Sequence, residues 1–147
     1  MRIYAGEVPH PTMFDDADPL LARVRRIALT LPEASEAIAH GRPTFRCGKM
    51  FGIYGGSVKG GSAKGSGRSG TSPVRHDHAV LFVPEQSERP ALTADPRFFV
   101  PAYLGPYGWL GLDVTADCDW DEIAELLDAS YRAVAPQRCI VLLDATR

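Results

Sequence analysis

The sequence predicts an α+β domain of two layers, in which an antiparallel sheet carries helices packed on one face. Three observations lead to this prediction. A helical pattern comes early in the chain and a second one lies near its end. Short alternating apolar segments, separated by glycine and proline, occupy the middle and are typical of strands. The connections between them are too short for the crossovers that parallel strands need, so we expect antiparallel pairing.

The first predicted helix starts after Asp18, whose carboxylate can cap it, and Pro19 suits its first turn. The apolar residues that follow recur at helical spacing: Leu20, Leu21, Val24, Ile27, Ala28 and Leu31. Pro32 ends the helix. Residues 1–17 have no useful periodicity, and we expect them to form an N-terminal arm on a single domain of residues 18–147.

Three short strands are expected next, over residues 37–40, 44–47 and 49–54. Residues 55–75 then break the pattern, because they contain seven glycines, five serines and no acidic residue. Such a segment buries too little apolar area to become ordered, so we expect a flexible loop between two strands. The strand after this loop covers residues 78–83.

Another strand is predicted over residues 109–114. Residues 84–96, which come before it, contain three prolines and are expected to form a short helical turn at most. Residues 138–143 at the end of the chain are apolar, but their pattern does not decide between helix and strand.

The second long helix is predicted over residues 119–135, where Asp119 and Glu122 resemble a capping box. Its buried stripe consists of Trp120, Ile123, Leu127, Tyr131 and Val134. Ser130 lies in the same stripe, and we expect it to pack there or to bond back to the helix backbone.

Composition and charge argue against several classes of protein. The 147 residues carry 16 basic and 18 acidic side chains, a net charge of −2, whereas a dedicated DNA-binding protein usually has a clear positive excess. No apolar run approaches the roughly 20 residues of a membrane-spanning helix, so we expect no membrane partner. Cys47, Cys118 and Cys139 are odd in number and lack CxxC spacing, which argues against a disulfide framework and predicts a cytoplasmic location.

No catalytic or cofactor-binding constellation stands out. Residues 65–70 fit the GxGxxG pattern, but a strand follows them instead of a helix, so we predict no nucleotide cofactor. His76 and His78 fall on one face of an extended segment and are weak candidates for a metal site, although their spacing matches no established zinc motif. We therefore predict no cofactor, metal or catalytic residue. An enzyme stays an alternative, because mobile glycine-rich lids often belong to enzymes.

Two groups of residues are candidates for binding. The first is a run of seven cations without an intervening acid: Arg42, Arg46, Lys49, Lys59, Lys64, Arg68 and Arg75. These side chains can contact phosphates, and the wholly acidic charges of residues 113–128 predict an electrostatic dipole. The second group is Tyr103, Tyr107 and Trp109 in a stiff turn, which suits stacking on bases or flat ligands. The alternative is a small aromatic core that locks this turn against the sheet.

Five segments of the chain resemble the MmcQ/YjbR-like family of small bacterial proteins. They are residues 31–33, 40–51, 98–103, 108–110 and 130–136. The resemblance extends in order over residues 18–138. It implies a compact α+β fold described as a double wing, similar in topology to frataxin-type domains, and a DNA-binding function. Some family members accompany antibiotic-biosynthesis genes, which implies ligand sequestration instead.

Two functional hypotheses follow. The first is a non-catalytic cytoplasmic protein that binds DNA, with phosphate contacts from the seven cations and stacking on Tyr103 or Trp109. The second is a protein that binds or sequesters a flat or anionic small molecule, such as one of antibiotic type. That ligand would sit between the open face of the sheet and the turn of residues 103–109, with the glycine-rich loop as a lid.

Overall fold

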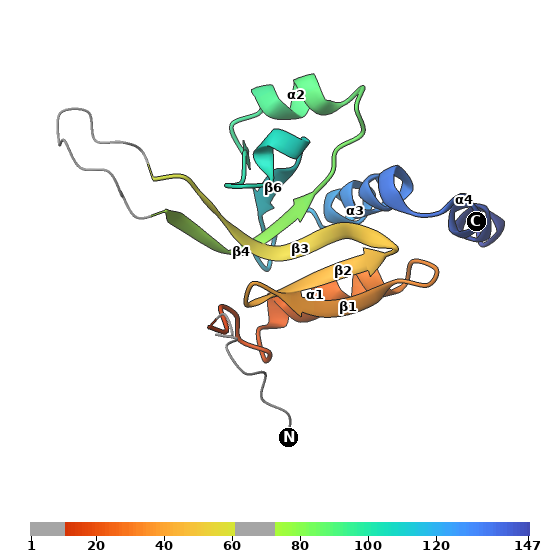
Figure 1. The fold of residues 1–147 in the computed structure, drawn as a ribbon, viewed down its shortest axis with the longest axis horizontal. Coiled ribbons are helices and arrows are strands. Elements are labelled where there is room, and N and C mark those ends of the chain that lie inside the picture. The colour runs from red at the N-terminus through yellow and green to blue at the C-terminus, as the bar shows by residue number, and fades with distance from the viewer. Residues whose placement is uncertain (1–10, 61–72) are drawn as a thin grey trace, which may run out of the picture.

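The computed structural model describes residues 11–60 and 73–147. Within these residues six strands form one antiparallel sheet in the order β1-β2-β3-β4-β6-β5 (Figure 1). The strands are β1 (Ser35–Ala39), β2 (Arg42–Cys47), β3 (Lys49–Val58), β4 (Val74–Phe82), β5 (Phe98–Phe99) and β6 (Leu110–Asp113). The helices are α1 (Pro19–Leu29), α2 (Arg89–Ala94), α3 (Trp120–Val134) and α4 (Gln137–Ala145), with a 3-10 helix η1 (Gly105–Tyr107).

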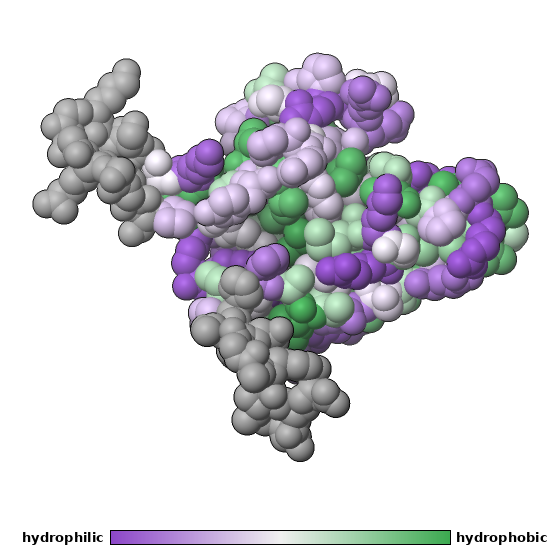
Figure 2. All heavy atoms as spheres, in the orientation of Figure 1, coloured by the Kyte–Doolittle hydropathy of each residue, from purple (hydrophilic) through white to green (hydrophobic). Residues whose placement is uncertain are grey.

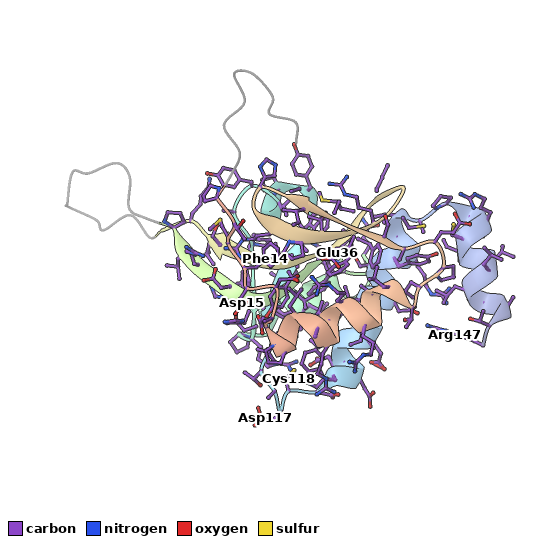
Figure 3. The ribbon with its side chains drawn as sticks, turned by 90° about the horizontal axis from the view of Figure 1, so that it is seen from below. Phe14, Asp15, Glu36, Asp117, Cys118 and Arg147 are labelled. Carbon is purple, nitrogen blue, oxygen red and sulfur yellow. The ribbon has the colours of Figure 1, made fainter. Side chains whose placement is uncertain are left out.

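Helices α1 and α3 pack against the same face of the sheet, which confirms the predicted two-layer α+β fold (Figure 3). The core between the layers is built from buried side chains of both helices and the strands, among them Leu21, Phe45, Phe51 and Leu127. The helices also touch each other, because the guanidinium of Arg23 lies 4.3 Å from the ring centre of Trp120. At the outer edge, Arg25 Nε of α1 donates to Glu36 Oε1 of β1 at 2.6 Å.

Both long helices begin where the sequence predicts. Asp18 caps α1 through Oδ1, which accepts a backbone N–H of the first turn at 2.9 Å. Asp119 caps α3 in the same way and accepts two N–H groups at 3.1 and 3.2 Å. The predicted capping box is not completed, because the carboxylate of Glu122 accepts two hydrogen bonds from Arg97 at 3.0 Å. Glu122 therefore ties α3 to the segment before β5.

Ser130 fastens α3 to the sheet. Its hydroxyl donates to the carbonyl oxygen of Phe51 at 2.5 Å and accepts the N–H of Val83 at 2.8 Å. The side chain is fully buried. These partners lie 79 and 47 residues away, and they take the place of the expected bond to the helix's own backbone.

Two segments are more regular than predicted. β3 continues to Val58 and β4 starts at Val74, so strand structure extends into both ends of the predicted loop of residues 55–75. Residues 61–72 of that loop lie outside the described residues. Residues 138–143 fall within α4, which follows α3 after a short break.

The other face of the sheet carries a smaller apolar cluster. Ile53, Leu81 and Trp109 are buried in it, and Leu104 packs against them from the loop before β6. Helix α1 lies behind the strands in Figure 1, so Figure 2 shows this face, on which hydrophobic and hydrophilic residues are interspersed. Within residues 11–60 and 73–147, no helix combines the length and apolar character that crossing a membrane requires.

Candidate nucleic-acid interface

Strands β3 and β4 leave the sheet together as a two-stranded ribbon. β2 pairs with β3 only as far as Ile53, and β6 pairs with β4 only from Ala79 onward. Beyond these points β3 and β4 pair with each other alone: Gly56 with His76, Ser57 with Arg75, and Val58 with Val74. Figure 1 shows this ribbon extending past the neighbouring strands. We define the ribbon as residues 55–58 and 74–77.

Two of the predicted cations lie on the ribbon or directly after it. Lys59 follows the last residue of β3, is exposed and forms no ion pair with another described residue. Arg75 lies on β4 with about half of its side chain exposed, and its Nε donates to Asp77 Oδ1 at 3.0 Å. The predicted contacts Lys64 and Arg68 lie outside the described residues.

Arg42 lies at the base of the ribbon and is 7% exposed. Its Nη2 donates to Asp77 Oδ1 at 3.0 Å, the same oxygen that accepts Arg75. Burial opposes ionisation of Asp77, but the two guanidiniums outweigh this effect and hold the pKa of the carboxyl below its usual range. The structure therefore gives the buried Arg42 a structural partner in Asp77, and its predicted role as a phosphate contact is not supported by this position. The cluster keeps one excess positive charge at the ribbon base.

Arg46 and Lys49 lie at the opposite end of β3. They flank the tight turn between β2 and β3, where Arg46 pairs with Met50 and Lys49 with Cys47. Arg46 Nε donates to Thr44 Oγ1 at 3.3 Å. Lys49 and Lys59 are ten residues apart along an extended strand, which separates them by roughly 30 Å. The single predicted basic patch is therefore divided into two groups.

The three predicted aromatic residues also separate. Tyr103 and Tyr107 are 82% and 78% exposed, whereas Trp109 is 7% exposed. Tyr103 lies beside the ribbon, because the N–H of its neighbour Ala102 donates to the carbonyl oxygen of Ser57 at 2.8 Å. Trp109 packs in the apolar cluster on the open face of the sheet, as the small-core alternative expects. Its predicted role in stacking on a ligand is not supported by this position.

That apolar cluster also fills the predicted small-molecule position. Ile53 and Leu81 of the sheet meet Trp109 and Leu104 of the loop, so the space between sheet and turn holds packed side chains. A ligand at this point would have to displace buried apolar groups, which costs free energy.

His76 and His78 do not share a face, contrary to the prediction. The pairing of β3 with β4 shifts register between Tyr54 and Gly56, and this irregularity changes the alternation of side chains on β4. His76 Nδ1 lies 2.8 Å from Asp113 Oδ1, and its ring stacks on Phe99 with centres 4.0 Å apart. Over residues 11–60 and 73–147 no group of three or more His, Cys, Asp or Glu side chains is arranged to hold a metal.

His78, which is exposed, contacts the buried side chains of Asp18 and Tyr54 in a polar cluster that joins β4 to the start of α1. Asp18 Oδ2 accepts the hydroxyl of Tyr54 at 2.5 Å and lies 2.9 Å from His78 Nδ1. Desolvation opposes ionisation of Asp18, but these partners and the N–H of Leu20 outweigh it and hold the pKa of Asp18 below its usual range. Burial and the adjacent carboxylate raise the pKa of Tyr54, which keeps its phenol a donor.

Sequence reasoning missed this cluster beyond the capping role of Asp18. Tyr54 and His78 lie 36 and 60 residues from Asp18 along the chain, so no local motif contains all three. The capping role of Asp18 was the one signal that the sequence offered.

The fold and this interface define a small two-layer α+β protein whose sheet extends into a two-stranded ribbon, with Arg42 and Lys59 beside it. A family model described as YjbR matches residues 29–133. The chain therefore belongs to the YjbR family, which confirms the resemblance found in the sequence. The matched residues contain all six described strands and most of α3. No curated protein and no solved structure matches the chain, so similarity to frataxin-type domains stays a prediction.

Proposed function

We propose that this protein binds nucleic acid through the ribbon of β3 and β4, without catalysis. The observation that carries this proposal is a two-stranded ribbon in which β3 and β4 extend past their pairing with β2 and β6. A ribbon of this kind fits the major groove of B-form DNA, which is about 12 Å wide. The chain that joins its two strands contains Lys59, Lys64 and Arg68 and no acidic residue.

The charges at the ribbon base support phosphate contact. Arg42 and Arg75 share a single carboxylate, so the base keeps a positive excess next to the free cation of Lys59. Besides Asp77, the ribbon contacts Asp113 of β6, whose Oδ1 lies 2.8 Å from His76 Nδ1. Contacts of this type position a protein on nucleic acid without reading its sequence.

Tyr103 provides a surface for base stacking beside the ribbon. Its backbone has φ 68°, a left-handed conformation that tyrosine rarely adopts. Backbone strain of this kind is concentrated at functional sites. An exposed ring held in this way can stack on an unpaired base, which contributes about 1–3 kcal/mol per base.

The test is fluorescence anisotropy with labelled single- and double-stranded oligonucleotides and the full chain, at about 50 and about 200 mM salt. We expect binding at the lower concentration and a steep loss at the higher one. Lys59→Ala should weaken binding and lower the salt slope by about 1. The matched control is Lys49→Ala, which removes an exposed lysine at the other end of β3 and should leave binding unchanged.

Two results would contradict the proposal. One is the absence of binding at about 50 μM protein in the lower salt. Non-specific phosphate contact gives dissociation constants of about 1–100 μM at physiological salt, and binding is tighter at lower salt. The other is a loss of binding in Lys49→Ala and not in Lys59→Ala, which would place the contact at the turn between β2 and β3.

A further inference from the structure

A groove of about 950 Å³ lies at the far end of β4 from the ribbon. Its walls come from three parts of the fold: the segment that follows β4, the turn around η1, and one side of α3. None of these residues belongs to the ribbon, so the groove is independent of the proposed nucleic-acid interface.

Arg89 is the cation in this groove whose charge is left unpaired by the described residues. Its Nε donates to the carbonyl oxygen of Gly108 at 3.4 Å, a long hydrogen bond. The other arginine of the lining, Arg132, donates to Asp128 at 2.7 Å and to Asp144 at 2.8 Å. Arg89 also lines a second hollow of about 490 Å³, so its side chain borders two open spaces.

Tyr107 presents an exposed ring to the same groove. The wall that α3 contributes contains Ala129 and Ala133, whose side chains are short. A planar ring placed on Tyr107 would therefore meet little steric obstruction from the helix. Aromatic rings stack with centres about 4.5–7 Å apart and gain about 0.5–1.5 kcal/mol beyond the burial of area.

The acidic residues of the lining disfavour a ligand with several negative groups. Glu85 lies in the groove and is satisfied in part by the hydroxyl of Ser87. Asp128 is held by Arg132 and Arg147. A polyanion would meet these carboxylates, whereas a single anionic group can bind Arg89 alone.

We propose that this groove binds a small planar aromatic molecule that carries one anionic group, with the anion on Arg89 and the ring on Tyr107. An aromatic carboxylate and a mononucleotide share this chemistry. The inference does not rest on nucleic-acid binding by the ribbon.

Isothermal titration of the full chain with salicylate and with AMP tests the proposal, and salicylamide serves as the uncharged analogue. We expect at least one anionic probe to bind with a dissociation constant of about 1 mM or below, and salicylamide to bind more weakly than salicylate. Arg89→Gln should weaken that binding roughly tenfold to hundredfold, because it removes a charge-assisted hydrogen bond. The matched control is Arg26→Gln, at an exposed arginine of α1 outside the groove, which should bind like the wild type.

Tyr107→Leu tests the stacking half of the proposal. It should weaken the binding of both aromatic probes, salicylate and AMP, while the thermal unfolding temperature stays unchanged. Oligonucleotide binding should be the same in Arg89→Gln as in the wild type, so this site and the ribbon succeed or fail separately. The proposal is overturned if neither anionic probe binds at about 10 mM, or if Arg89→Gln binds as tightly as the wild type. Binding of salicylate alone or of AMP alone supports it and identifies the kind of ligand.

Discussion

The guanidinium of Arg42 occupies the space that a side chain on Gly55 would need. A Cβ atom at Gly55 would lie 2.1 Å from Arg42 Nη1, well inside the distance at which atoms touch. Gly55 also has φ +90°, a left-handed conformation that favours glycine. With Asp77, these residues form the point at which the ribbon leaves the sheet.

Gly55→Ala should therefore be strongly destabilising. We expect its free energy of unfolding to fall by about 2–4 kcal/mol, because a left-handed alanine is strained and the Arg42 ion pair has to move. The control is Gly108→Ala, where φ is +92° but the nearest atom to the new Cβ is 3.8 Å away. That variant should lose only the backbone cost of about 1–2 kcal/mol. Equal losses in urea denaturation would contradict the role given to Arg42.

Ser130→Ala should reveal how much the hydroxyl contributes to joining α3 and the sheet. The variant leaves the carbonyl of Phe51 and the N–H of Val83 without this partner in the core. Each unsatisfied buried group costs about 1–3 kcal/mol, so we expect a loss of about 2–4 kcal/mol in the free energy of unfolding. Ser87→Ala, on the exposed segment after β4, should change stability by less than about 0.5 kcal/mol. If Ser130→Ala also changed the free energy of unfolding by less than about 0.5 kcal/mol, the hydroxyl would not join α3 to the sheet in the way described.

The cluster around Asp18 predicts a stability that depends on acid pH. Because the folded pKa of Asp18 lies below its usual range, ionised Asp18 stabilises the protein above that range, and this stabilisation disappears as pH falls through the folded pKa. Asp18→Asn keeps a capping side chain but loses the charge. We expect it to cost about 1–3 kcal/mol near pH 6, where the charged hydrogen bonds to Tyr54 and His78 are present.

Urea denaturation at several pH values checks this prediction. The gap in stability between the wild type and Asp18→Asn should narrow as the pH falls below the usual pKa range of aspartate. Comparing the two proteins removes the contribution of other carboxylates with a lowered pKa, such as Asp77 and Asp95. Asp119→Asn, at the exposed cap of α3, should cost less because that carboxylate bonds only backbone groups. A gap that stays constant over this range would contradict the account.

Tyr103→Gly should separate folding from binding. Glycine adopts φ 68° without strain, so the variant should gain up to about 1 kcal/mol of stability. The same change removes the exposed ring and should weaken binding of single-stranded oligonucleotides by about 1–3 kcal/mol. Tyr107→Ala removes an equally exposed ring that faces the groove, and it should leave oligonucleotide binding unchanged. Wild-type binding by Tyr103→Gly would exclude stacking at this residue.

The layers of the fold follow from local patterns. Helices α1 and α3 are predicted by apolar residues at helical spacing and by their capping carboxylates, Asp18 and Asp119. The central strands are predicted by alternation and by the glycines between them. Their ends are less predictable, because pairing between β3 and β4 keeps glycine-rich residues 55–58 in a strand that their composition disfavours.

The site follows from the sequence only in part, because it depends on distances between strands. The run of cations contains no sign that Arg42 is buried against Asp77 or that β3 separates Lys49 from Lys59. The register shift that parts His76 from His78 is likewise a property of two paired strands. Periodicity predicts which residues alternate along one strand, and the pairing of strands decides which of them meet.

The most direct test of the central claim is the salt dependence of nucleic-acid binding. It compares the wild type with a triple variant, Lys59→Ala, Lys64→Ala and Arg68→Ala. Each neutralised phosphate contributes about 0.9 to the slope of log affinity against log salt on duplex DNA, so the slope should fall by up to about 2.7. Affinity at low salt should fall for all DNA sequences alike. A triple variant that binds with the wild-type affinity and slope would contradict binding through the ribbon and the chain that joins its two strands.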